Sequence, residues 1–111
     1  MDLTWKDFQK VEMRVGTITE VNEFPEARKP AFQLKIDFGE KIGFKKSSAQ
    51  ITSRYAVEEL KGKQVIAVVN FPKKQIANFM SECLVLGVVG EQSDIVLLEP
   101  GFKVENGLRV G

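Results

Sequence analysis

Two apolar segments joined by a polar, basic loop constrain the fold of this chain more than any other feature. Residues 64–70 and 83–89 are rich in Val, Ile and Leu without polar alternation, a pattern typical of strands that are covered on both faces. We therefore expect them to form the central pair of a sheet. The loop between them carries Lys73 and Lys74 and no acid before Glu82, so this sheet should present a cationic loop.

The first half of the chain predicts a bent strand followed by a hairpin. Residues 9–24 form a long strand pattern whose apolar phase changes at Gly16, which indicates a bend or bulge at that glycine. Residues 32–38 alternate apolar and polar side chains, as a half-buried strand does. We expect Ile42 and Phe44 to continue this alternation on a returning antiparallel strand.

Two helices are predicted. Thr4 should cap a short N-terminal turn, with Asp7 as its reciprocal partner, and Trp5 and Phe8 should share one face. So short a turn must dock either on the rest of the domain or on a second copy of the chain. A second helix of about two turns is expected over residues 55–62.

The second helix should begin at Thr52 or Ser53 and end at Gly62. A further strand over residues 94–99 and a tail over residues 102–111, with a turn at 106–107, complete the chain. These elements predict an all-β fold, the five-stranded Greek-key barrel known as the OB-fold. It has a short helix between strands three and four, a short N-terminal helix and a C-terminal extension. Such barrels bind ligands on strands two and three and at the loops after strands one and four.

Length and composition favour one domain, residues 1–111, without catalysis. The chain has 111 residues and no histidine, which removes imidazole general bases and the commonest zinc ligand sets. We expect no enzyme activity, no metal and no cofactor. Cys83 stands alone and should be a small buried apolar residue. No signal or membrane-spanning pattern is present, which predicts a cytoplasmic protein without membrane insertion.

The charges are distributed unevenly along the chain. Residues 41–54 and 70–80 hold six bases and no acid, while the whole chain has 16 bases and 15 acids. The remainder therefore carries 10 bases and 15 acids, a net charge of −5. The six bases are Lys41, Lys45, Lys46, Arg54, Lys73 and Lys74. They predict a basic face suited to phosphate backbones, and simple solvation of the six is the alternative.

Several side chains near these bases leave two interpretations open. Phe71 and Phe79 could stack on bases, or at least one of them could close the end of the barrel. Arg14 could be a solvated charge on a strand edge or a ligand contact. Polar side chains of the loop could bind splayed bases or cap their own turns; they are Asn70, Gln75, Asn78 and Ser81.

Six spaced motifs add a resemblance to a known family. They are residues 13–16 (MRVG), 23–27 (EFPEA), 36–39 (IDFG), 60–65 (LKGKQV), 69–72 (VNFP) and 81–82 (SE). Together they resemble the tRNA-binding domain family, a barrel also appended to methionyl- and phenylalanyl-tRNA synthetases. Residues 26–31, 46–52 and 69–72 resemble most the small free-standing, CsaA-like members, which are described as secretion-related chaperones.

The resemblance implies a homodimer that binds tRNA by shape and phosphate contacts. The implied RNA-binding residues are Lys45, Lys46, Ser48, Gln50, Asn70, Lys73, Lys74 and Ser81. The implied dimer contacts are Trp5, Phe8, Phe102, Val104 and Val110. The alternative that it implies is a chaperone that binds unfolded or presecretory polypeptides in a groove of the dimer.

The chain departs from the family pattern at two positions of the loop. Leu84 stands where many members have Met, so a contact made by that Met is not carried over. Asn78 replaces a usual Gly, and we expect it to preserve the turn because asparagine tolerates left-handed backbone.

Overall fold

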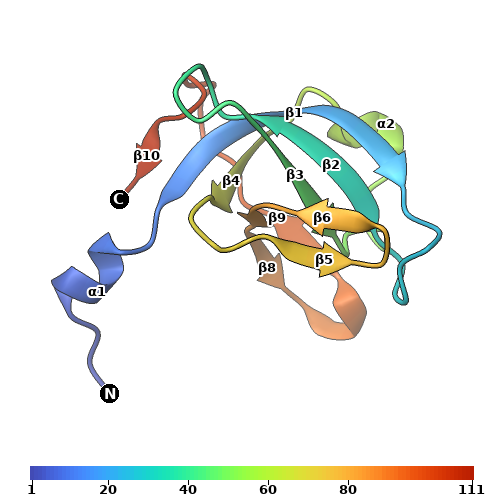
Figure 1. The fold of residues 1–111 in the computed structure, drawn as a ribbon, viewed down its shortest axis with the longest axis horizontal. Coiled ribbons are helices and arrows are strands. Elements are labelled where there is room, and N and C mark those ends of the chain that lie inside the picture. Colours follow the sequence, from blue (N-terminus) through green and yellow to red (C-terminus); the bar gives the residue numbers. More distant parts are fainter.

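The protein, described by a computed structural model of all 111 residues, Met1–Gly111, consists mainly of strands (Figure 1). Its helices are α1 (Trp5–Gln9), α2 (Val57–Leu60) and the 3-10 turn η1 (Glu91–Ser93). The first strands are β1 (Met13–Glu23), β2 (Phe32–Asp37), β3 (Phe44–Ala49), β4 (Gln64–Val68) and β5 (Lys74–Ile76). They are followed by β6 (Phe79–Ser81), β7 (Leu84–Val85), β8 (Gly87–Val89), β9 (Ile95–Leu97) and β10 (Arg109–Val110).

The sheet is organised around β1. Its order is β3-β2-β1-β4-β7, and β10 adds to the start of β1. The first half of β1 pairs with β4 and the second half with β2, so one bent strand serves both parts of the sheet. The backbone N–H of Glu82 donates to the carbonyl of Lys46 over 2.7 Å, which joins the far end of the sheet to β3. The predicted five-stranded barrel, with α2 between β3 and β4, is confirmed.

The irregularity of β1 lies at a different residue from the one predicted. The register with β2 shifts between Ile18 and Glu20, whereas the pairing of Gly16 with β4 is regular. Gly16 is required for another reason: a Cβ atom there would lie 2.6 Å from Ile36 and 2.7 Å from Phe38. Gly16 therefore lies on the core-facing side of β1 with Ile18, and the bulge follows a few residues later.

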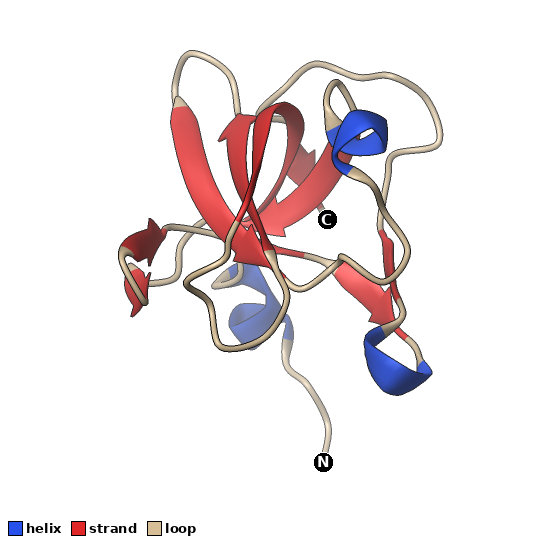
Figure 2. Cartoon of the chain, turned by 90° about the vertical axis from the view of Figure 1, so that its right-hand side faces the viewer, coloured by secondary structure: helices blue, strands red, loops and turns tan.

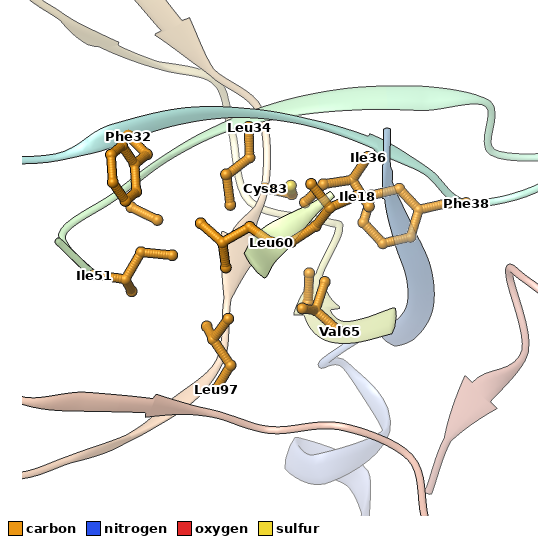
Figure 3. Close-up of a cluster of buried hydrophobic side chains, with 12 residues drawn as sticks. Ile18, Phe32, Leu34, Ile36, Phe38, Ile51, Leu60, Val65, Cys83 and Leu97 are labelled. Atoms are coloured by element: carbon orange, nitrogen blue, oxygen red, sulfur yellow. The ribbon is translucent and has the colours of Figure 1, made fainter. Parts of the chain in front are cut away.

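The core lies inside the barrel and confirms the alternation predicted for β2. Phe32, Leu34 and Ile36 are buried, and the residues between them are only partly covered. Figure 3 shows these side chains converging with those from β1, α2, β4 and β9. The lone Cys83 is also part of this cluster, as expected of a small buried residue.

The hairpin of β2 and β3 differs from the prediction at its returning strand. Ile42 lies in the turn, and β3 begins only at Phe44. Because Phe44 pairs with Asp37, and not with a buried residue of β2, it faces away from the core. Its side chain is 56% exposed.

The helix between β3 and β4 is one turn rather than two. It starts after Ala56, whose backbone N–H donates to the Glu59 carboxylate over 2.8 Å. The predicted start at Thr52 or Ser53 is therefore wrong. The predicted end is correct, because Gly62 has φ +90°, a left-handed value that favours glycine at a helix end.

The two apolar segments are not the central pair of the sheet. β1 holds that place, β4 lies beside it, and β7 is the last strand of the order. The second segment is also not covered on both faces, since Leu84, Val88 and Val89 are 48%, 58% and 78% exposed. The loop between the segments is itself structured, because it contains the β5–β6 hairpin.

The C-terminal strand β10 pairs with the start of β1, whereas the N-terminus lies away from the barrel (Figure 1). Thr4 Oγ1 accepts a hydrogen bond from the Asp7 backbone N–H, which confirms Thr4 as the cap. The reciprocal contact predicted for Asp7 does not form, because its carboxylate lies 3.4 Å from Lys10 Nζ. The rings of Trp5 and Phe8 pack edge to face, with their centroids 6.3 Å apart. Helix α1 buries no residue and stands away from the barrel in Figure 1. In Figure 2 it lies behind the lower loops of the barrel, with the N-terminal segment extending below them. None of the helices could span a lipid bilayer.

Candidate nucleic-acid interface

Two grooves flank the β5–β6 hairpin where it meets the loop after β1. They share Ser48, Gln50, Lys74 and Ile76. The larger groove, about 930 Å³, adds Ala27, Arg28, Lys29, Ala31, Gln75 and Ala77. The smaller groove, about 610 Å³, adds Phe71, Pro72, Lys73, Ser81, Cys83 and Leu84. Neither lining includes an acid.

The hairpin forms around a two-residue turn. Ile76 pairs with Phe79, which leaves Ala77 and Asn78 to connect the strands. The residue with left-handed backbone is Ala77, with φ +52°. The sequence predicted this conformation for Asn78, its neighbour in the turn, so that prediction is wrong by one residue. The side-chain amide of Gln75 donates to the Ala77 carbonyl over 3.1 Å and supports this uncommon conformation.

The Ser-Glu motif at 81–82 holds the hairpin against β3. The backbone N–H of Ser48 donates to Ser81 Oγ over 3.3 Å. The backbone N–H of Lys46 donates to a carboxylate oxygen of Glu82 over 3.0 Å. These contacts satisfy N–H groups on the free edge of β3, so the motif positions the groove walls.

The positive charge of the grooves comes from two loops. Arg28 and Lys29 follow β1, while Lys73 precedes β5 and Lys74 begins it. Lys73 Nζ lies 3.5 Å from Glu82; the other three make no ion pair with a carboxylate. Because these three charges are uncompensated, the grooves favour an anionic ligand.

The structure brings together five of the eight predicted RNA-binding residues. Those that line a groove are Ser48, Gln50, Lys73, Lys74 and Ser81. Asn70 instead joins α1 to the barrel, because its amide accepts from the Glu12 N–H over 3.1 Å and donates to the Lys10 carbonyl over 2.6 Å.

The two neighbouring lysines of β3 point to opposite faces. Lys45 shares a face with buried Ser47 and Ala49, whereas Lys46 lies on the outer face. Lys46 Nζ is 5.3 Å from the ring centroid of Phe79, which packs in turn on Phe24 at 5.4 Å. Phe79 therefore takes the packing role that was the alternative to stacking.

Arg54, counted with the basic face, is engaged elsewhere. Its guanidinium donates two hydrogen bonds of 2.8 Å to Asp94. The same contacts hold the pKa of the Asp94 carboxyl below its ordinary value. Arg14 is likewise neither solvated nor free for a ligand, since it donates to the Gly107 carbonyl over 3.1 Å and to Glu12 over 2.9 Å.

Arg28 and Lys29 were not predicted from the sequence. Glu23 at the end of β1 and Glu26 in the loop precede them, so this segment did not stand out by its charge. The rule that OB-fold ligands bind at the loop after strand one was the signal that could have found them.

The predicted dimer contacts fall into two groups. Trp5 and Phe8 line a hollow of about 370 Å³ that also includes Gly111, the neighbour of Val110. Trp5 is 80% exposed there. Phe102 and Val104 lie elsewhere, beside Gln64 at the start of β4.

The fold and the grooves define a class of protein. A barrel built on one bent strand, with a helix between its third and fourth strands, is an OB-fold, and its acid-free grooves lie at the two loops that this fold uses for ligands. A sequence model described as "Putative tRNA binding domain" matches residues 13–109. The chain belongs to the tRNA-binding domain family.

Similar proteins agree with this assignment. Methionine–tRNA ligase from Porphyromonas gingivalis is 32% identical over 109 residues, which are 98% of this chain and only 16% of the ligase. The crystal structure of chaperone CsaA from Bacillus anthracis superposes with a TM-score of 0.95 at 50% identity, with 100% of both chains covered. The crystal structure of a CsaA chaperone protein from Picrophilus torridus superposes with a TM-score of 0.92 at 51% identity. This match covers 99% of the present chain and 100% of the Picrophilus chain. The predicted resemblance to CsaA-like members of the family is confirmed.

Proposed function

We propose that this chain is a non-catalytic, homodimeric tRNA-binding protein that binds structured RNA by shape and phosphate contacts. The observation that carries this proposal is the pair of acid-free grooves at the ligand loops of the barrel. Arg28, Lys29 and Lys74 offer charges without a protein partner there, and Lys73 adds a fourth charge. A tRNA partner would place the protein in the cytoplasm.

Binding of bulk tRNA across a salt series tests the proposal. Four phosphates neutralised per chain should give a slope of about −3 for log affinity against log salt. Filter binding measures this slope directly. Absent binding, or binding that does not respond to salt, would reject the function.

A charge-reversal pair locates the site. The double variant Lys73→Glu/Lys74→Glu should bind tRNA much more weakly and with a shallower salt slope, since it removes two phosphate contacts and adds two repulsive charges. The single variant Lys74→Glu has a matched control in Lys61→Glu, because the two change net charge equally and Lys61 is exposed outside both grooves. An equal loss in both variants would show that net charge, rather than the grooves, determines binding.

The dimer is proposed on the aromatic pair of α1, of which Trp5 is exposed and Phe8 is half-buried. Trp5 and Phe8 form a half-covered hollow with the end of the chain, and a helix that buries no residue needs a partner surface. The second predicted group, Phe102 and Val104, would lie at a separate edge of the same interface. Sedimentation should show a dimer at micromolar concentration, and Trp5→Ala should shift it toward monomer.

A second function is supported by the CsaA likeness and by the smaller groove. Phe71, Pro72, Ile76 and Leu84 give that groove an apolar wall, which could hold extended segments of unfolded or presecretory polypeptides. Suppression of the aggregation of denatured luciferase at high salt tests this role. If Lys73→Glu/Lys74→Glu loses tRNA binding but still protects luciferase, then the two activities use different contacts.

A further inference from the structure

The outer face of β2 and β3 carries one large apolar side chain that phosphate binding does not explain. The antiparallel register places three pairs on this face: Asp37 with Phe44, Lys35 with Lys46, and Gln33 with Ser48. Five of these six side chains are polar. Phe44 is the exception, and with 56% of its surface exposed it contributes little to the core.

One cation lies over this ring, and a second lysine follows on the same face. Lys35 Nζ lies 4.8 Å from the ring centroid of Phe44. Lys46 lies directly across from Lys35, and like charges opposite each other on neighbouring strands repel. An anionic group bound between the two lysines would relieve this repulsion, so the face favours a ligand that combines negative charge with a flat apolar surface.

The acids on this face are already engaged. Asp37 accepts a hydrogen bond of 2.8 Å from the Gly39 backbone N–H and so holds the turn. Glu20 lies 3.9 Å from Lys35 Nζ, with its side chain 62% exposed. Neither carboxylate pairs with Lys46, whose Nζ lies 5.3 Å from the Phe79 ring centroid, so the positive charge of Lys46 has no anionic partner in the protein.

The row of outer residues leads into the grooves. Residues two apart on a strand are separated by about 6.8 Å, so Phe44, Lys46 and Ser48 form a line along β3. Ser48 at the end of this line borders both grooves. A ligand in the grooves can therefore extend along β3 and reach Phe44 without leaving the protein surface.

We propose that Phe44 is a stacking platform for one unpaired base of the bound RNA, with Lys35 and Lys46 holding the adjoining phosphates. This inference rests on the proposed RNA-binding function and specifies its ligand: an RNA with a single-stranded nucleotide next to its helical part. A single exposed ring beside a lysine is too small for a protein interface, whereas aromatic rings beside cations are the usual contacts of single-stranded nucleic acid.

A fluorescent RNA pair tests the platform in the full-length protein. One probe is an RNA hairpin with an unpaired 2-aminopurine overhang, and the other is the same hairpin with a blunt end. Phe44→Leu should weaken binding of the overhang probe by about 5-fold or more, because the stacking contact between one base and the ring is lost. Its salt slope should stay unchanged, because no phosphate contact is removed.

The blunt probe and the conservative variant serve as controls. Phe44→Leu should bind the blunt hairpin like the wild type, and Phe44→Trp should retain affinity for the overhang and quench 2-aminopurine. Thermal unfolding of each variant checks that the fold is kept.

The outcomes separate this inference from the proposed function. If the wild type binds both probes with a steep salt slope while Phe44→Leu binds the overhang equally well, then the stacking platform is wrong and the RNA-binding function stands. Equal losses on both probes would also overturn it, since they would show a general role for Phe44. If the wild type binds neither probe nor tRNA, both proposals fall.

Discussion

Replacing Gly16 by alanine should measure how tightly the barrel is packed at its bent strand. The added Cβ would lie 2.6 Å from Ile36 Cγ2 and 2.7 Å from two ring carbons of Phe38, and both neighbours are almost completely buried. Carbon atoms prefer separations of about 3.5–4.0 Å, so the core must shift by roughly 1 Å. Overpacking of this kind costs about 1–3 kcal/mol.

The net effect is smaller because alanine also restricts the unfolded chain. That restriction stabilises the folded protein by about 0.4–1 kcal/mol. The free energy of unfolding should therefore fall by roughly 1–2 kcal/mol in total. For a chain of this size we expect the melting temperature to fall by about 5–10 °C. Thermal and urea unfolding followed by circular dichroism measure the change.

Two further variants make the result decisive. Gly101→Ala is the matched control, because no atom lies within 4 Å of the added Cβ and the backbone there is not left-handed; it should change stability by less than about 0.5 kcal/mol. Phe38→Leu removes the ring that the Cβ added at position 16 would meet, so the double variant should be less destabilised than the sum of the single changes. Equal stability of the Gly16→Ala and Gly101→Ala proteins would refute the packing argument.

Two ionisable groups give further predictions. Burial raises the pKa of the Cys83 thiol to about 12, so at pH 8 Ellman's reagent should label the folded protein far more slowly than the urea-unfolded chain; equal rates would contradict the burial. Arg54→Gln should raise the pKa of Asp94 toward its ordinary value, as followed by NMR titration of the carboxyl carbon, because the two guanidinium hydrogen bonds that lower it are lost. Since the pKa is lowered in the folded state, the stability that this pair adds is present above the unfolded pKa of about 4 and is lost as the pH falls through the folded value. The stability curves of wild type and variant should therefore converge in acid, and curves that stay apart would rule out this pair as the cause.

Local patterns predicted the elements whose burial is determined by their own sequence. The alternation of β2 is confirmed because each of its inward side chains meets the core of the same barrel. The cap at Thr4 and the helix end at Gly62 are also local, since one hydrogen bond or one left-handed residue determines each of them.

The position of a strand within the sheet could not be predicted in this way. The apolar segment at 83–89 suggested a strand covered on both faces, yet Val88 and Val89 are exposed. An apolar run reports that side chains can be covered, but topology decides whether another element lies over them. For the same reason, Phe44 continued an apolar alternation in the sequence while the register turned it outward.

The candidate site was predicted as regions better than as residues. The loop after β4 was recognised by its charge, and Ser48, Gln50, Lys73, Lys74 and Ser81 do line the grooves. Successive side chains of β3 point to opposite faces of the sheet, so Lys45 and Lys46 do not share a surface. The charge of a segment as a whole does not distinguish its two faces. Ion pairs between distant segments, such as Arg54 with Asp94, are equally invisible before the fold is known.

The closure of the barrel between β3 and the Ser81-Glu82 segment has a consequence for how a ligand would act on the protein. The edge of β3 is joined there by a few hydrogen bonds, two of which use side-chain acceptors rather than a continuous backbone ladder. Such a junction should open more readily than the paired strands elsewhere. A ligand that contacts both β3 and the hairpin would stabilise the closed form of this junction. The amide hydrogens of Lys46 and Ser48 would then exchange with solvent more slowly once the ligand is bound.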